Sequence, residues 1–60
     1  MKRSLYKIQY QPISDVWVDV FDTSDTHKLY DMFLHLTSKH ENALFRCLIL
    51  FGDTYREILI

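Results

Sequence analysis

Three histidines and a single cysteine are the side chains of this sequence best suited to bind a metal or attack a substrate. They are His27, His35, His40 and Cys47, and no two of them have the short spacing typical of a structural zinc site. Cys47 lies in the middle of an apolar run, where burial would raise the pKa of its thiol and keep substrates away. We therefore expect solvated or capping histidines and a buried thiol, and we predict no metal, no cofactor and no catalytic residue.

Four aspartates lie within the eleven residues 15–25, with no basic residue between them: Asp15, Asp19, Asp22 and Asp25. The segment lacks the ligand alternation and the central glycine of a calcium loop, so calcium binding is not expected. One interpretation is an acidic edge that attracts a basic partner, for instance the cationic groove of a nucleic-acid-handling protein. The alternative, which we favour, is turn and helix-cap chemistry plus one solvated strand position.

A small basic cluster near the start consists of Lys2, Arg3 and Lys7, with Tyr6 and Tyr10 nearby. Aromatic side chains on a sheet can stack on single-stranded bases, but these tyrosines are expected to face a helix. Seven Lys plus Arg against eight Asp plus Glu give a formal charge of −1. This balance argues against a protein that neutralises many phosphates of duplex nucleic acid, and it disfavours single-stranded binding as well.

The length and composition indicate one domain, 1–60, near the lower size limit for folding alone. A chain of this size has little room for an active-site cleft, so we expect neither an enzyme nor a small-molecule ligand. A single cysteine cannot form an internal disulfide, which favours a reducing, cytoplasmic setting. No apolar run reaches the roughly 18 residues of a membrane span, and no signal-peptide core follows the first residues. We expect a soluble protein without membrane contact.

The stretch 43–60 predicts the β-hairpin around which the rest is organised. Two runs of apolar and aromatic residues, 43–51 and 54–60, flank Gly52-Asp53, a pair typical of a two-residue turn. This turn predicts four opposed pairs that share one face: Phe51 with Thr54, Ile49 with Arg56, Cys47 with Ile58, and Phe45 with Ile60. Both faces of the hairpin are largely apolar, so a helix on one face leaves the other in need of a partner.

Two alternating segments, 5–11 and 15–21, predict a pair of strands before this hairpin. Pro12 cannot donate to a ladder, so we place the turn between them at 11–14. Residues 22–25 favour a helix N-cap, and a helix is expected to end near 39–42. Its apolar stripe recurs at three- and four-residue steps: Leu29, Met32, Phe33 and Leu36, with Tyr30 widening it.

The element order is therefore β-β-α-β-β, an α+β fold. Pairing the third strand with the first gives a four-stranded antiparallel sheet in the order 2-1-3-4, with the helix on one face. The covered face is expected to hold these strand residues: Tyr6, Ile8, Tyr10, Val16, Val18, Val20, Phe45, Cys47, Ile49, Phe51, Ile58 and Ile60.

The opposite face is expected to carry apolar residues interspersed with charges. They are Leu5, Lys7, Trp17, Asp19, Leu44, Arg46, Leu48, Leu50, Tyr55, Glu57 and Leu59. An apolar patch of that extent on a monomer indicates an interface, and Trp, Tyr and Arg are the types that most often carry binding energy. The alternative is that twist and long polar side chains cover these residues. We predict a protein-binding site formed by Trp17, Asp19, Leu44, Arg46, Leu48, Leu50, Tyr55, Glu57 and Leu59.

Three segments also carry a resemblance: Tyr6-Lys7-Ile8, the stretch Asp15 to Thr23 with its central Trp17, and Phe45-Arg46-Cys47. Together with the intervening helix they resemble many small, uncharacterised bacteriophage proteins with a Trp-containing strand, a Phe-Asp-Thr-like cap, one helix and a further strand. The apolar end at 55–60 departs from the shorter versions. The resemblance implies a phage origin and a site of action in the host cytoplasm, where such proteins often bind and disable or redirect a host protein.

Two functions from different classes follow. The first is a non-enzymatic protein-binding module that acts stoichiometrically on a host protein, for example as an inhibitor of a defence or nucleic-acid-processing enzyme. The second is a self-associating structural module, a homodimer formed through the open sheet face. Binding of single-stranded nucleic acid ranks third because of the charge balance.

Overall fold

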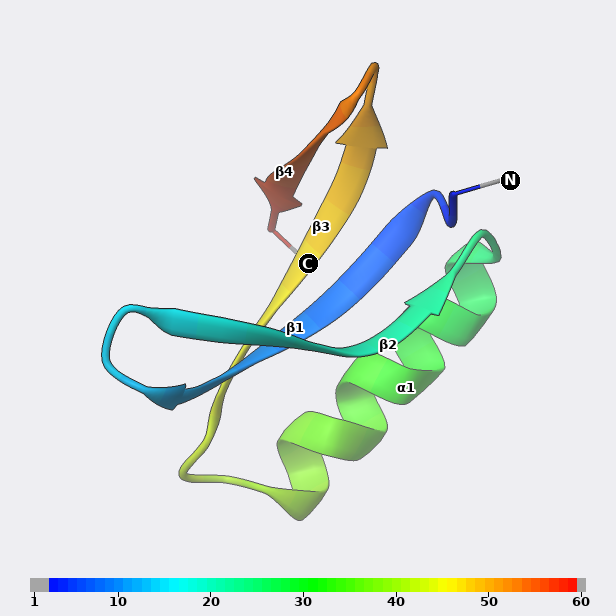
Figure 1. The fold of residues 1–60 in the computed structure, drawn as a ribbon. Coiled ribbons are helices and arrows are strands. Elements are labelled where there is room, and N and C mark those ends of the chain that lie inside the picture. The colour runs from blue at the N-terminus through cyan, green and yellow to red at the C-terminus, as the bar shows by residue number, and fades with distance from the viewer. Residues whose placement is uncertain (1–2, 60) are drawn as a thin grey trace.

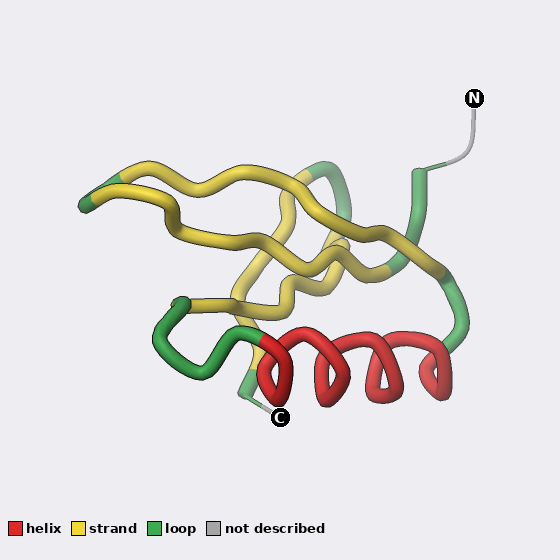
Figure 2. Tube along the Cα trace, turned by 90° about the horizontal axis from the view of Figure 1, so that it is seen from below, coloured by secondary structure: helices red, strands yellow, loops and turns green. Residues whose placement is uncertain are grey.

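Over residues 3–59, which the computed structural model describes, the chain forms four strands and one helix (Figure 1). In chain order they are β1 (Tyr6–Ile13), β2 (Val16–Thr23), α1 (Thr26–Lys39), β3 (Leu44–Phe51) and β4 (Thr54–Ile58). The strands pair antiparallel in the order β2-β1-β3-β4, and α1 lies along one face of the sheet (Figure 2). The predicted α+β fold and its strand order are confirmed.

The turn of the β3–β4 hairpin falls at the predicted Gly52-Asp53 pair. Gly52 has a φ of 65°, a left-handed conformation that a residue without a Cβ adopts at little cost. The observed register contains three of the predicted pairs: Phe51 with Thr54, Ile49 with Arg56, and Cys47 with Ile58. The fourth predicted pair includes Ile60, which lies outside the described residues.

The β1–β2 hairpin turns later than predicted. β1 continues through Pro12, and the turn is formed by residues 14–15, where Asp15 has a φ of 65°. An aspartate tolerates this left-handed conformation better than most side chains. Pro12 is accommodated because the ladder to β2 is irregular between Tyr10 and Ile13. Its missing N–H therefore removes no regular ladder bond.

Both ends of α1 fall within the predicted ranges. The carboxylate of Asp25 caps the helix by accepting from the backbone N–H groups of His27 and Lys28, at 2.8 and 3.3 Å. At the other end, His40 donates its backbone N–H to a carbonyl of the last turn. Lys39 places a positive charge where the helix dipole is negative.

The core lies between α1 and the two central strands. Ile8 of β1, Leu29 of α1 and Cys47 of β3 are each no more than 2% exposed. Partly buried side chains surround them: Tyr6, Phe21, Met32, Phe33, Leu36, Phe45 and Ile58. Most of these were expected on the covered side, and Phe21 is the exception.

A bulge in β2 explains the position of Phe21. Ile8 pairs with Phe21, but the next residue of β1, Gln9, pairs with Asp19, so Val20 is an extra residue in β2. Because a bulge re-aims side chains, Phe21 packs against the core although strict alternation places it on the opposite face.

The same strand overturns the prediction that its valines lie in the core. Val16, Val18 and Val20 are 40, 41 and 44% exposed. They lie on an edge strand whose hairpin turn projects beyond the end of α1 (Figures 1 and 2). Phe51 was likewise predicted to be covered. It is largely exposed next to the β3–β4 turn, with the Arg56 guanidinium 4.9 Å from its ring centroid.

Candidate functional site

We call the side of the sheet opposite α1 the open face, because no element within residues 3–59 covers it (Figure 2). Directly opposed residues of paired strands share a face, so the register identifies its members. They are Lys7, Gln9, Gln11, Asp19, Asp22, Leu44, Arg46, Leu48, Leu50, Tyr55 and Glu57, and Trp17 joins them through its contact with Arg46.

Lys7, Gln9 and Asp19 form a hydrogen-bonded cluster across β1 and β2. The Lys7 ammonium donates to Asp19 Oδ2 at 2.9 Å, and the Gln9 amide donates to Asp19 Oδ1 at 2.7 Å. The bonds from Gln9 and Lys7 hold the pKa of the Asp19 carboxyl below its ordinary value. The bond to Asp19 in turn raises the pKa of the Lys7 ammonium. Both effects favour the charged forms at neutral pH.

Arg46 organises a second cluster that bridges all four strands. Its Nε donates to Gln9 Oε1 at 2.8 Å, and its guanidinium carbon lies 4.2 Å from the ring centroid of Trp17. Its Nη1 lies 3.9 Å from Glu57 Oε1, a loose ion pair on the β4 side. Gln9 therefore links the clusters, because it accepts from Arg46 and donates to Asp19.

Tyr55 lies at the end of the open face nearest the β3–β4 turn. Its hydroxyl donates to the carbonyl of Ser4 at 2.6 Å, and the Lys7 ammonium lies 4.6 Å from its ring centroid. Ser4 also donates through its hydroxyl to Asp22 Oδ1 at 2.9 Å. The segment before β1 is thus attached to both β2 and β4.

Leu48, in the middle of the open face, is shielded from water. It lies on β3 opposite Lys7 and Glu57, yet it is only 6% exposed. Because no helix or strand among residues 3–59 covers this face, we infer that neighbouring side chains on the sheet shield Leu48. The expectation that Leu48 is exposed on this face is corrected accordingly, because its side chain is buried.

The nine predicted binding residues divide into three groups. Six lie in or directly beside the clusters described above: Trp17, Asp19, Arg46, Leu48, Tyr55 and Glu57. Leu50 pairs with Tyr55 on the same face, and Leu44 lies at the start of β3, where it is largely exposed. Leu59 follows β4 and is 96% exposed, outside the paired part of the sheet.

Two residues at the centre of the open face, Lys7 and Gln9, were not among the predicted binding residues. Both are polar positions of an alternating strand, and such positions are usually interpreted as solvated. The predicted strand order would have been enough to place Lys7 and Gln9 at the centre of the open face. With β1 central, Gln9 lies opposite Arg46 and Lys7 lies opposite Leu48.

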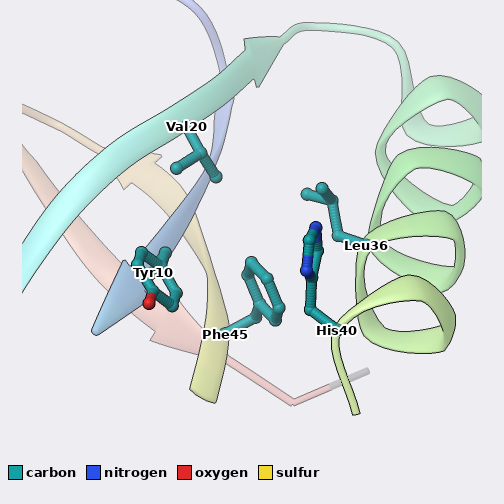
Figure 3. A pocket seen from close by; sticks show the side chains of 5 residues that line it. All are labelled: Tyr10, Val20, Leu36, His40 and Phe45. Carbon is teal, nitrogen blue, oxygen red and sulfur yellow. The ribbon is translucent and has the colours of Figure 1, made fainter. Parts of the chain in front are cut away.

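The side of the sheet that faces α1 contains a small apolar cleft of about 270 Å³ near the end of the helix (Figure 3). Tyr10, Val20, Leu36, His40 and Phe45 line it. The Phe45 ring lies 5.5 Å from that of Tyr10 and 6.3 Å from that of His40, measured between centroids.

The four aspartates of residues 15–25 serve different local purposes. Asp15 forms the β1–β2 turn, Asp19 accepts from Lys7 and Gln9, Asp22 accepts from Ser4, and Asp25 caps α1. Within residues 3–59, no three His, Cys, Asp or Glu side chains converge as metal ligands would.

Burial raises the pKa of the Cys47 thiol to about 11. That shift keeps the thiol protonated and weakly nucleophilic at neutral pH, as predicted for an apolar strand position. In the part of the chain that the structure describes, no helix has the length and apolar character needed to cross a membrane.

Comparisons of the chain with protein-family models, with curated proteins and with solved structures gave no match.

Proposed function

We propose that this chain is a non-enzymatic protein-binding module that acts stoichiometrically through its open face. The observation that carries the proposal is the Arg46–Trp17 stack, joined to Gln9, on a sheet face that no described helix or strand covers. Trp and Arg, with Tyr beside them, are the side-chain types that dominate binding energy in protein interfaces.

The hydrogen bonds within the face support this assignment. A long side chain that is already held in one conformation loses less entropy on binding, and Arg46 and Lys7 are both held in this way. Within the clusters, the positive charges of these two residues are paired with the negative charges of Asp19 and Glu57. Such a surface suits a folded protein with alternating charges better than a polyanion.

The class of partner follows from the resemblance to small bacteriophage proteins. We propose a host protein as the partner, with inhibition of a defence or nucleic-acid-processing enzyme as the concrete form. In this proposal the protein works by occupying a surface of its target, so one copy acts on one target molecule and is not turned over.

The test is affinity capture from host lysate with the tagged protein, followed by reconstitution with the purified partner. Trp17→Ala and Arg46→Ala should each weaken the reconstituted complex at least about tenfold, as expected for truncation of a hot spot. Leu34→Ala is the matched control, because Leu34 is 62% exposed on α1, away from the open face. The proposal fails if both open-face variants remain folded and bind the partner as tightly as the control.

A further inference from the structure

Arg46 has unused hydrogen-bond donors on the open face. Its Nε donates to Gln9 Oε1 at 2.8 Å, and its guanidinium carbon lies over the Trp17 ring, 4.2 Å from the ring centroid. Its Nη1 is 3.9 Å from Glu57 Oε1, which is too far for a hydrogen bond. Within residues 3–59, neither Nη1 nor Nη2 donates to a protein acceptor. These two nitrogens carry most of the N–H donors of an arginine.

The direction of the unused donors limits what can bind them. A guanidinium binds a two-oxygen acceptor side-on, through Nε and one Nη, or end-on, through Nη1 and Nη2. Gln9 occupies Nε, so the end-on edge of Arg46 remains. The arginine side chain is 27% exposed, and its contacts with Gln9 and Trp17 already hold it in one position. It therefore loses little conformational entropy when a ligand binds to that edge.

We propose that the protein partner places the carboxylate of an aspartate or glutamate end-on against Nη1 and Nη2 of Arg46. The inference rests on the proposed function, because it names the chemical group of the partner that the open face binds. The carboxylate accepts two parallel N–H bonds, an arrangement in which arginine–carboxylate pairs are both strong and specific in direction.

The charges around Arg46 favour a carboxylate over a phosphate group. Lys7 is the other cation among the open-face residues, and its ammonium already donates to Asp19 at 2.9 Å. The Asp19 and Glu57 carboxylates lie on the same face. Both repel a phosphate group, which carries about two negative charges at neutral pH. A carboxylate carries one negative charge, which matches the single positive charge of Arg46.

Glu57 is the chain's own competitor for this edge. Its carboxylate approaches Nη1 without forming a hydrogen bond, and its side chain is 56% exposed. It can therefore turn toward water when the partner's carboxylate binds. Removing the negative charge of Glu57 should strengthen the binding of an acidic group to Arg46. The opposite sign is expected for a basic partner group, because Glu57 would then attract it.

Selection of displayed random peptides on the purified protein tests the chemistry of the partner group. Peptides that bind the natural sequence but not Arg46→Ala should share an aspartate or glutamate. Replacing that residue by its amide in the synthetic peptide should weaken binding at least about tenfold. Arg46→Lys keeps the charge but lacks the planar fork, so it should weaken the same peptide to a similar extent. The inference is overturned if selection yields no such peptide, or if Arg46→Lys binds it as tightly as the natural sequence.

Glu57→Gln tests the sign of the charge and leaves Arg46 in place. It should raise the affinity for the selected acidic peptide about threefold, because a loose, exposed ion pair no longer competes. Asp31→Asn, the same change of net charge on α1, should leave the affinity unchanged. An affinity that falls or stays constant in Glu57→Gln contradicts an acidic partner group, even where the Arg46 variants fail to fold.

The peptide experiment and the capture from host lysate can fail separately. If no host protein is captured while the peptides behave as expected, the proposed host target fails and the carboxylate site on Arg46 stands. If a captured partner depends on Arg46 but on none of its own acidic residues, the carboxylate inference fails and the proposed function stands.

Discussion

The guanidinium carbon of Arg46 on β3 lies 4.2 Å from the ring centroid of Trp17 on β2, although β1 separates the two strands. The arginine reaches across β1 because Gln9 lies directly opposite it and accepts from its Nε. A cation over an indole ring is the most favourable of the cation–aromatic pairs, and the hydrogen bond fixes its position. This one arginine therefore connects the two hairpins on the open face.

The first prediction concerns this stack. Arg46→Ala should expose the Trp17 ring to water and shift its fluorescence emission to longer wavelength. The free energy of unfolding should fall by about 1 to 2 kcal/mol, from the lost cation–aromatic contact and one charge-assisted hydrogen bond. Trp17 is the only tryptophan of the sequence, so the emission reports on this site alone.

Arg56→Ala is the matched control for Arg46. Its guanidinium lies 4.9 Å from the ring centroid of Phe51, at the far end of the β3–β4 hairpin. Removing it should leave the Trp17 emission unchanged. An unshifted emission in Arg46→Ala, or an equal shift in both variants, would contradict the stacked arrangement.

The second prediction concerns the pH dependence of the Asp19 cluster. The pKa of Asp19 is lowered in the folded state, so its contribution to stability is present above the ordinary value, about 3.9. That contribution is lost as the pH falls through the lower folded-state value. Urea unfolding between about pH 5 and 2 should therefore show a steeper loss of stability in the natural sequence than in Asp19→Asn. Because Asp19 is about half exposed, we expect a difference below about 1 kcal/mol.

Asp31→Asn controls for the change in net charge, since Asp31 lies on α1 and not on the open face. It should keep the steep acid dependence of the natural sequence. If Asp19→Asn keeps the same dependence, the bonds from Gln9 and Lys7 do not persist in solution.

The fold could be predicted wherever local chemistry decides it. Gly52-Asp53 sets the β3–β4 register by itself, because a two-residue turn leaves one way to pair the flanking strands. Asp25 likewise specifies where α1 begins. Strand order followed because a helix between the hairpins brings β3 back beside β1.

The bulge and the open-face network could not be predicted in the same way. The segment around Val20 alternates regularly, so only its pairing with β1 shows that it contains an extra residue. Leu48 lies between Lys7 and Glu57 on neighbouring strands and is buried, and no period in the sequence encodes this burial. These non-local contacts place Phe21 in the core and bury Leu48, both of which were predicted to lie on the open face.

The third prediction concerns the reactivity of Cys47. With a pKa of about 11 and 1% exposure, the thiol should not react with a thiol-specific reagent at pH 8 in the folded protein. The reaction should appear in parallel with unfolding as urea is added. Because the pKa of Cys47 is raised in the folded state, the contribution of the buried thiol to stability is fully present below the ordinary pKa of 9.0. That contribution is lost as the pH rises through the folded-state pKa of about 11. Rapid labelling under native conditions would contradict burial in the core.

The fourth prediction uses two leucines on the same strand and the same face. Leu48 is 6% exposed at the centre of the open face, whereas Leu44 is 60% exposed at the start of β3. Leu48→Ala should lower the free energy of unfolding by about 2 to 3 kcal/mol, because it removes a buried side chain and leaves a cavity.

Leu44→Ala should change stability by less than about 0.5 kcal/mol, as expected for an exposed position. Urea denaturation with circular dichroism measures both variants. Since the substitution, strand and face are identical, the difference isolates the shielding by neighbouring side chains. Equal losses of stability would mean that the neighbouring side chains do not shield Leu48 in solution and that Leu48 contacts water. Leu48 would then belong to an exposed apolar patch interspersed with charges, as the sequence predicts.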